Sequence, residues 1–341
     1  MTTKDISTMG NIYDVLKMKA PNGSPVDSVV NTLIETDDWS NRTPTRPANG
    51  GLTNHGLRTT GLPTSYVVDI GGSWKESKSA REPFTDGLIT LRSTYQAPKD
   101  TFTAEEPAVG RALLEEEKKN HVIAMNQAAM NMILRGSNAT TKVQGDLTGI
   151  LERAPYQAID SIYTFDVGGS GANLRHALLV KPGIATVHSL YNPFHPTLGI
   201  EQEDKGEVRI NDLGTSNDEH RYDICIEFAI TRGICIRDLT ALKLLANIPV
   251  AATDNPGADL VNAAIEASII KAPKNNNSTW ILYLDERAYA KLVRTQNDKT
   301  FVYTSAANIW RTELPMISPN IAIARMDALN KVLGSGETQI T

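Results

Sequence analysis

Residues 221–238 read RYDICIEFAITRGICIRD, and their character alternates over an unusually long segment. Isoleucine or phenylalanine fills the even positions from 224 to 236, apart from Arg232, whereas the odd positions carry Cys, Glu, Ala, Thr, Gly and Arg. A period of two is typical of a β-strand with one buried face. The segment therefore predicts a long, half-buried strand.

The only two cysteines of the chain, Cys225 and Cys235, both lie on this segment. Ten extended residues span about 33 Å, which is several times the Cα separation that a disulfide allows. We therefore expect two reduced, unpaired thiols. The six histidines show none of the spacings that seat zinc, so the sequence predicts neither a metal site nor a cofactor.

A second decisive segment is the stretch 104–135, which contains no helix breaker except Pro107 and Gly110. Proline is tolerated in a first helical turn, and Gly136 provides a C-terminal stop. The ends of the segment are apolar, but its middle, EEEKKNH at 115–121, is polar all round. This pattern predicts one helix of about 30 residues that lies across a surface.

The first 98 residues divide into an arm and a projection. Two short helical patterns, at 11–18 and 25–38, are too small to form a domain. The stretch 41–63 is rich in Asn, Thr, Gly and Pro, and strand-like runs follow at 64–70 (TSYVVDI) and 87–95 (GLITLRSTY). We interpret 41–98 as an extended excursion built on a long β-hairpin.

The second half of the chain has the pattern of a mixed α/β layer. A turn region begins at Asn247 and Pro249, and the patterns that follow predict a helix at 258–271, a buried strand at 279–284, a helix at 285–296 and a final strand at 321–329.

Composition excludes several classes of protein. A length of 341 residues suggests about two domains, and 40% hydrophobic residues are enough for a core. The net charge of −5 argues against a protein whose main affinity is for nucleic acid. No run of 18 apolar residues and no signal peptide is present, so we expect a cytoplasmic product without a membrane partner.

The sequence contains no recognisable catalytic constellation. GGSG at 168–171 lacks the spacing of phosphate and dinucleotide loops, and no GxSxG elbow occurs. Acids such as Glu201, Glu203 and Asp204 could ligate a cation, although a solvated hairpin is the commoner explanation. A projecting arm without a polar site is typical of a protein that contacts copies of itself, so we expect no enzymatic activity.

Two segments have opposite charge. The stretch 42–81 holds six basic residues against two acids, and 201–223 holds eight acids against three bases. They could neutralise each other within one subunit or steer the docking of a neighbour. The candidate inter-subunit contacts are Arg42, Arg46, Arg58, Lys75, Lys78, Arg81, Glu201, Glu203 and Asp204.

Several segments resemble the major capsid proteins of tailed bacteriophages with the Hong Kong 97-like fold, especially the short-tailed epsilon-fifteen and Bordetella phage branch. The similar segments are HGLRTTGLPTSYVVDIGGSWKESKS (55–79), AMNQAAMNMILRGS (124–137), GDLTGILERAPY (145–156), HRYDICIEFAITRGICIRDLTALKLLANI (220–248), STWILYLDERAYAKL (278–292) and NIAIARMDAL (320–329). The chain departs from that branch where LLANI replaces RIANI and YLDE replaces YMNR.

The resemblance implies an α+β Hong Kong 97-like capsid fold with interleaved domains. The implied parts are an N-terminal arm (1–40), an extended β-hairpin loop (41–98), a peripheral domain (99–155 and 205–250) with the long spine helix (104–135), an axial domain (156–204 and 251–330) and a C-terminal tail (331–341).

The implied function is that of a major capsid protein that forms the hexamers and pentamers of an icosahedral head around double-stranded DNA. Its implied partners are copies of itself, a portal protein, scaffolding and decoration proteins, and the packaged DNA by non-specific contact. The implied location is the virion, after assembly in the host cytoplasm. An encapsulin-like compartment shell and a soluble α/β enzyme are the alternatives. Lys75 and Lys78 lie where some members of the fold cross-link, but no partner Asn is identifiable, so we predict no cross-link.

Overall fold

The computed structural model describes residues 39, 42–100, 107–136, 147–159, 161–171, 173–194, 200–211, 220–251, 254–273, 278–298, 316–318, 320–330 and 339–340. The chain divides into two compact units, of which the first contains 91–126 and 200–230 and the second contains 37–90, 127–199 and 231–341. The helical patterns expected at 11–18 and 25–38 lie outside the described residues. The peripheral and axial boundaries given above stay predictions.

The long strand expected at 221–238 is present as β8, His220–Ile236, and β7, Ile200–Asn211, pairs with it antiparallel. The register runs from Ile200 opposite Ile230 to Asn211 opposite His220, with a shift between Asp204 and Gly206. The acidic segment therefore begins on a β-hairpin, as the sequence suggested.

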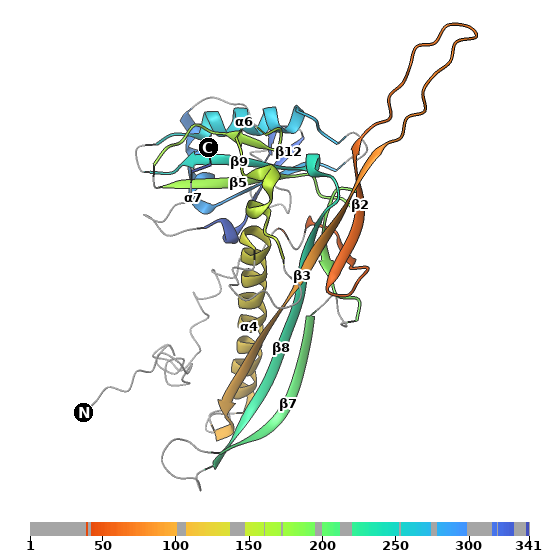
Figure 1. Cartoon of the computed structure of the whole chain (residues 1–341). Helices are drawn as coiled ribbons and strands as arrows, with labels where there is room; N and C mark the ends of the chain where they lie inside the picture. The colour runs from red at the N-terminus through yellow and green to blue at the C-terminus, as the bar shows by residue number, and fades with distance from the viewer. Residues whose placement is uncertain are drawn as a thin grey trace. The chain divides into compact units, whose positions relative to one another are not determined.

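The core of the first unit confirms the alternation along β8. Even-numbered side chains of β8 pack with residues of α4, Pro107–Arg135, and of β3, Ala80–Pro98. This cluster consists of Met125, Ile226, Phe228 and Ile230, with Leu91, Tyr95, Leu114 and Ile224 packed against it. α4 realises the helix expected over 104–135, of which residues 104–106 lie outside the described part (Figure 1).

One residue of the polar middle of α4 is held inside this unit. His121 stacks on Phe228 with ring centroids 5.5 Å apart, and its Nδ1 is hydrogen-bonded to Ser93 Oγ at 2.7 Å. Tyr95 meets the same imidazole edge-on at 5.6 Å. The polar stretch of the helix therefore contributes a specific contact to the core, which the polarity of the segment alone did not indicate.

The second unit contains a mixed six-stranded sheet in the order β11-β12-β10-β5-β9-β4. The bounds of these strands are Met316–Ser318, Ile321–Arg325, Trp280–Leu284, Leu174–Val180, Leu242–Pro249 and Thr164–Asp166. Pairing is parallel between β10 and β12 and between β4 and β9, and antiparallel elsewhere. The central strands are buried along almost their whole length, which is typical of strands covered on both faces.

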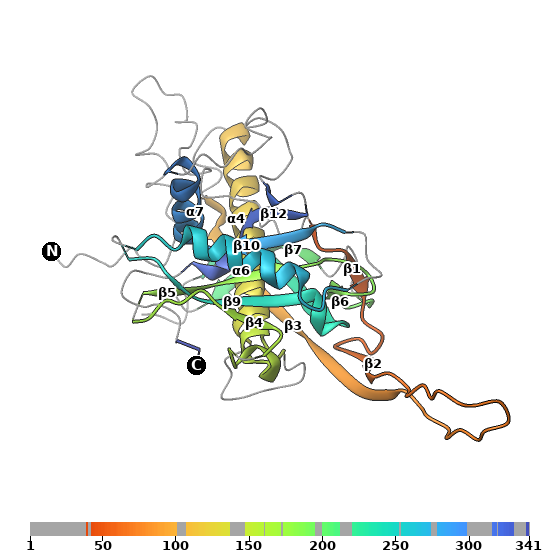
Figure 2. The same ribbon diagram turned by 90° about the horizontal axis from the view of Figure 1, so that it is seen from above.

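Helices complete this layer. α6, Gly257–Ile269, packs on β4, β5 and β9 and contacts α7, Glu286–Asp298. Figure 2 shows α6 lying across the strands. Apolar residues from both helices and from the sheet form one continuous core, in which Leu260, Leu282 and Leu292 are fully buried.

A further sheet has the strand order β1-β6-β8-β3-β2, with β1 at Thr45–Pro47, β6 at Val187–Tyr191 and β2 at Thr53–Gly61. These three strands belong to the second unit, as do residues 80–90 of β3 and 231–236 of β8. β6 pairs antiparallel with the end of β8, and β1 pairs parallel with β6. Short 3-10 turns lie at Ile150–Glu152, Ala154–Tyr156, Leu239–Ala241 and Asp327–Leu329.

Three expectations need correction. TSYVVDI at 64–70 is not a strand: the hairpin strands are β2 and β3, and 64–70 lies in the loop between them, so its alternating pattern has no sheet to pack on. Asn247 and Pro249 do not begin a turn, because both belong to β9, where Asn247 takes the left-handed conformation (φ 58°). The final strand ends at Arg325, four residues earlier than expected, because a 3-10 turn follows at Asp327.

Candidate assembly surface

The hairpin of the second unit projects well beyond its paired part (Figure 1). β2 and β3 pair from Thr53 opposite Gly87 to Gly61 opposite Ala80, and the loop 62–79 extends beyond that last pair. A turn closes the loop, with Gly72 N donating to Asp69 O at 2.9 Å and Gly71 at φ 85°. Ser77 Oγ donates to Thr64 O at 2.8 Å and ties the two sides of the loop together.

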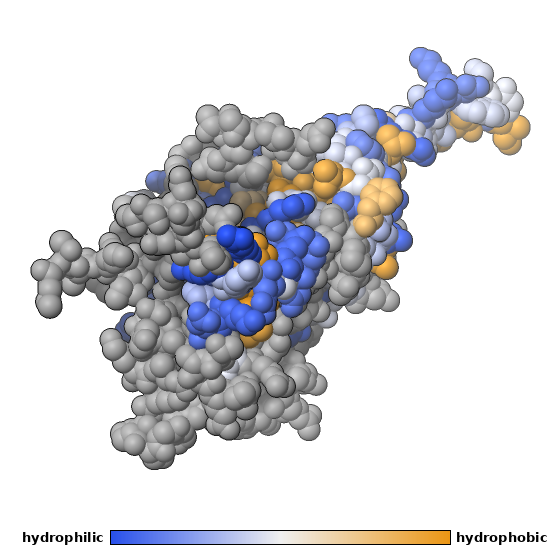
Figure 3. Space-filling view, turned by 90° about the horizontal axis from the view of Figure 1, so that it is seen from below, coloured by the Kyte–Doolittle hydropathy of each residue, from blue (hydrophilic) through white to orange (hydrophobic). Residues whose placement is uncertain are grey.

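The loop carries apolar side chains that the described residues leave uncovered. Val67 and Ile70 are fully exposed, and Trp74 is 73% exposed, with Leu62, Tyr66 and Val68 also exposed. Figure 3 shows apolar residues beside polar ones at the end of this projection. Exposed apolar clusters of this kind mark protein interaction sites. The loop can bury these side chains against another molecule.

The base of the hairpin is rigidly held. Arg58 Nη2 donates to Ile236 O at 2.7 Å, and the same guanidinium lies 4.7 Å from the centroid of the Phe84 ring. Gly56 faces Phe84 so closely that a Cβ at position 56 would collide with the ring. The Arg58 side chain therefore makes these contacts within its own subunit, at the base of the hairpin.

A buried ion pair stabilises the same base. Arg153 Nη1 lies 3.0 Å from Asp86 Oδ1, and the Asp86 side chain is almost fully buried. Burial raises the pKa of the Asp86 carboxyl, and the Arg153 charge opposes the increase. Cys235 lies beside this carboxyl, and burial raises the pKa of its thiol to about 12. Such a thiol stays protonated and unreactive at neutral pH.

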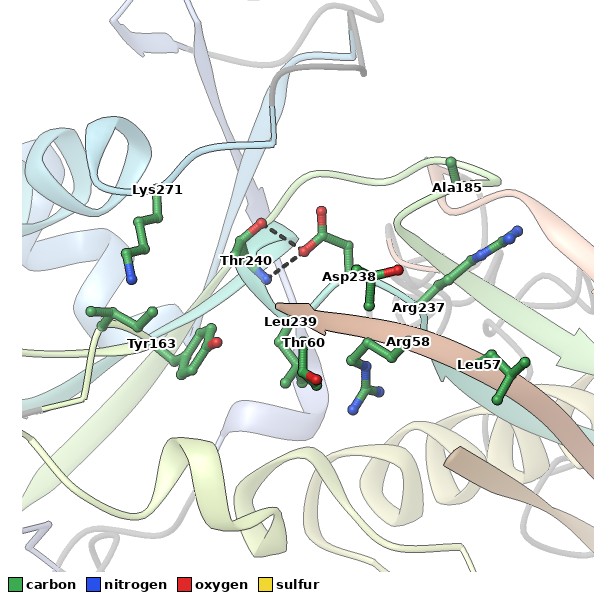
Figure 4. Close-up of a pocket in the computed structure, with 12 residues that line it drawn as sticks. Leu57, Arg58, Thr60, Tyr163, Ala185, Arg237, Asp238, Leu239, Thr240 and Lys271 are labelled. Atoms are coloured by element: carbon green, nitrogen blue, oxygen red, sulfur yellow. Dashed lines mark hydrogen bonds between the residues drawn. The ribbon is translucent and has the colours of Figure 1, made fainter. Parts of the chain in front are cut away.

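An open pocket of about 550 Å³ lies at the hairpin base (Figure 4). Its lining residues come from β2, from the segment 162–163 and from the turn after β8, together with Ala185 and Lys271. Asp238 caps that turn, since its Oδ1 accepts hydrogen bonds from Thr240 N at 2.9 Å and from Thr240 Oγ1 at 2.6 Å. Arg58, Arg237 and Lys271 make the lining predominantly basic.

The acidic strand belongs to the first unit. Glu203 pairs with Lys205 at 2.6 Å, and Glu227 lies 3.8 Å from the same ammonium group. Asp204 Oδ1 accepts from Gly206 N at 2.8 Å at the bulge of β7. Lys205 therefore neutralises part of the acidic patch within its own subunit.

The candidate contact residues have different surroundings. Arg46, Lys75, Lys78 and Arg81 are exposed, Arg42 and Arg58 are half-buried, and Glu203 and Asp204 are exposed. The side chain of Glu201 lies outside the described residues. The basic residues belong to the second unit and the acids to the first, so the expected contact between them stays a prediction.

Sequence reasoning missed the residues that fix the hairpin base, including Asp86 and Arg153. Their partners are distant in sequence, so no local pattern indicates them. The alternation along β3 could have shown that Asp86 is unusual, because it directly precedes the buried run Gly87–Leu88–Ile89. Among the described residues, no three His, Cys, Asp or Glu side chains form a metal-binding group, and no described helix is long and apolar enough to cross a membrane.

The fold agrees with comparisons to known proteins. The family model for the major capsid protein GP7 matches residues 20–333. No curated protein matches the chain.

Among solved structures, the chain is similar to a chain in the structure of bacteriophage epsilon15. The two share 16% identity and a TM-score of 0.65, and the match covers 98% of this chain and 99% of the epsilon15 chain. It is also similar to the capsid of bacteriophage JBD30, with 12% identity, a TM-score of 0.50, and coverage of 91% and 99%. These similarities show the Hong Kong 97-like fold that the sequence led us to expect. Since the family model spans most of its length, the chain belongs to the phage major capsid protein family GP7.

Proposed function

We propose that this chain is the shell-forming subunit of a tailed-phage head, which assembles with copies of itself into hexamers and pentamers around double-stranded DNA. The observation that supports self-assembly most directly is the projecting loop 62–79, whose apolar side chains are exposed in the isolated chain. A portal protein, scaffolding and decoration proteins and the packaged DNA are further expected partners. Assembly takes place in the host cytoplasm before the subunit becomes part of the virion.

The loop supports assembly because burying its apolar surface against a neighbour is favourable. A large apolar side chain contributes about 1.5 to 3 kcal/mol when it moves from water into a packed contact. Val67, Ile70 and Trp74 all start from an exposed state, so nearly their whole surface is available. In a closed shell the same contact repeats at every equivalent interface, so a modest gain per subunit stabilises the whole particle.

The test compares the expressed full chain with a variant in which residues 62–79 are replaced by an Asn-Gly turn. The replacement is confined to this loop because Leu88 and Ile89 of β3 are buried. Electron microscopy and sedimentation should show rings or shells for the full chain. The variant should remain small while its melting temperature is unchanged.

A milder pair of variants separates apolar contact from loop shape. Ile70→Ser with Trp74→Ser removes exposed apolar surface and should slow assembly, whereas Ser65→Ala with Ser73→Ala alters the same loop without removing any. Normal shells from the loop-replacement variant would contradict the proposal. Particles that enclose an enzyme would instead support an encapsulin-like compartment, and a monomer with substrate turnover would support an enzyme.

A further inference from the structure

A second pocket, of about 360 Å³, lies within the second unit beside the base of the hairpin. Strand register explains why its charged residues meet. His188 of β6 lies opposite Cys235 of β8, and Arg46 of β1 lies opposite Leu190, two residues beyond His188. Residues two apart on a strand share a face, so Arg46, His188 and Cys235 face the same side, and Arg237 continues that side past the end of β8.

The lining of this pocket has positive charge and no acid. It comprises Arg46, Pro47, Asn49, Asn54, His55, Gly56, Leu57, Phe84, His188, Cys235 and Arg237. Within the described part of the chain, neither Arg46 nor Arg237 has an ion-pair partner or a side-chain hydrogen bond. The nearby buried acid, Asp86, is already paired with Arg153. The two guanidinium groups therefore lie on one pocket with no counter-charge in its lining.

The ring of His188 lines this pocket. Its side chain is only 6% exposed, and its Nδ1 is shielded from solvent with no hydrogen-bond partner among the described residues. A buried polar atom without a partner is unfavourable, and such atoms are rare in folded proteins. Burial and the charges of Arg46 and Arg237 lower the pKa of this imidazole to about 4. The surroundings of the ring thus contain excess positive charge that an anion would neutralise.

We propose that this pocket binds a phosphate group between Arg46 and Arg237, beside the ring of His188. Guanidinium groups bind phosphate oxygens with paired hydrogen bonds, and phosphate offers oxygens in several directions, whereas a carboxylate offers two in one plane. The donors here come from β1, from β6 and from the end of β8, so they approach from separate strands. The volume also leaves room for an organic group that carries the phosphate. The bound group is either free phosphate or part of a nucleic acid backbone.

The test titrates the unassembled full chain with inorganic phosphate at constant ionic strength and measures binding by calorimetry. We expect saturable binding that Arg46→Gln and Arg237→Gln each weaken at least about tenfold, since each removes one charged donor. Arg209→Gln, at an exposed arginine on β7, is the matched control and should bind like the wild type. Absence of saturable binding, or equal weakening by all three substitutions, would overturn the proposal.

The pKa of His188 in the wild-type chain provides a second test, which does not depend on removing an arginine. A nearby anion favours the imidazolium form, so phosphate should raise the pKa of His188 in a histidine NMR titration, with His188→Gln used only to assign the signal. A short DNA duplex that competes with phosphate identifies a nucleic acid backbone as the source, whereas phosphate binding without such competition identifies the free ion. Acetate that binds as tightly as phosphate contradicts a phosphate site.

Discussion

Arg175 Nε lies 3.1 Å from Asp285 Oδ2 inside the second unit, and both side chains are almost completely removed from solvent. Asp285 also precedes α7 and accepts a hydrogen bond from Ala288 N through Oδ1 at 2.8 Å. One carboxylate thus neutralises a buried guanidinium and caps a helix at the same time. This pair joins β5 to the start of α7.

Removing one partner of this buried pair should therefore be costly. Asp285→Ala leaves Arg175 charged and without this partner, and we expect a loss of about 3 to 5 kcal/mol in the free energy of unfolding. Urea denaturation of the unassembled chain measures it. Glu207→Ala, which breaks the exposed pair with Lys99, is the control and should cost at most about 1 kcal/mol. Equal losses from the two substitutions would show that burial does not determine how much an ion pair contributes to the free energy of unfolding.

His188 should make stability depend on pH. Its pKa is lowered to about 4 in the folded chain, compared with about 6.5 when unfolded. Between these values the unfolded chain binds a proton that the folded chain does not, so stability falls as pH decreases from about 6.5 to about 4, by up to about 1.4 kcal/mol per pH unit.

Denaturation of the wild type and of His188→Gln in phosphate-free buffer measures this contribution. Other groups titrate in both proteins, so the difference between the two stability curves isolates His188. We expect the wild type to lose stability relative to the variant as pH falls through this window. Parallel curves would exclude a depressed pKa at this position.

Charge reversal at the hairpin should impair assembly. Lys75, Lys78 and Arg81 are exposed, and replacing all three with Glu should slow assembly or make it sensitive to salt, because steering by opposite charge is lost. Lys in place of Glu201, Glu203 and Asp204 should restore part of the rate. Because Lys205 already neutralises part of that patch, we expect incomplete rescue. Light scattering at low and high salt gives the rates, and unchanged rates in both would remove this contact from the assembly pathway.

The two thiols should differ in reactivity. Cys235 is buried with a pKa raised to about 12, so its thiolate fraction at neutral pH is on the order of a thousandfold below that of an ordinary thiol. Cys225 is half-buried, and a maleimide should label it first in the folded chain. In Cys225→Ser, labelling should require unfolding. Rapid labelling of that variant, or a disulfide-linked ladder from fresh particles, would contradict this assignment.

Elements with a local pattern could be predicted from the residues alone. The period of two along β8 and the absence of breakers through α4 could be read directly, because side-chain periodicity follows from backbone geometry. The projecting hairpin was also predictable, since its segment lacks enough apolar residues to form a core. Three of the six segments that resemble capsid proteins, 55–79, 124–137 and 220–248, overlap these elements.

Contacts between distant segments became visible only in the folded chain. TSYVVDI has the pattern of a strand, yet no neighbouring strand is available to it and its side chains remain exposed. The pocket around His188 combines residues 46, 188 and 237, which come together through the parallel register of β1 with β6 and the antiparallel register of β6 with β8. Strand register depends on contacts between distant segments, so the periodicity of any one segment cannot specify it.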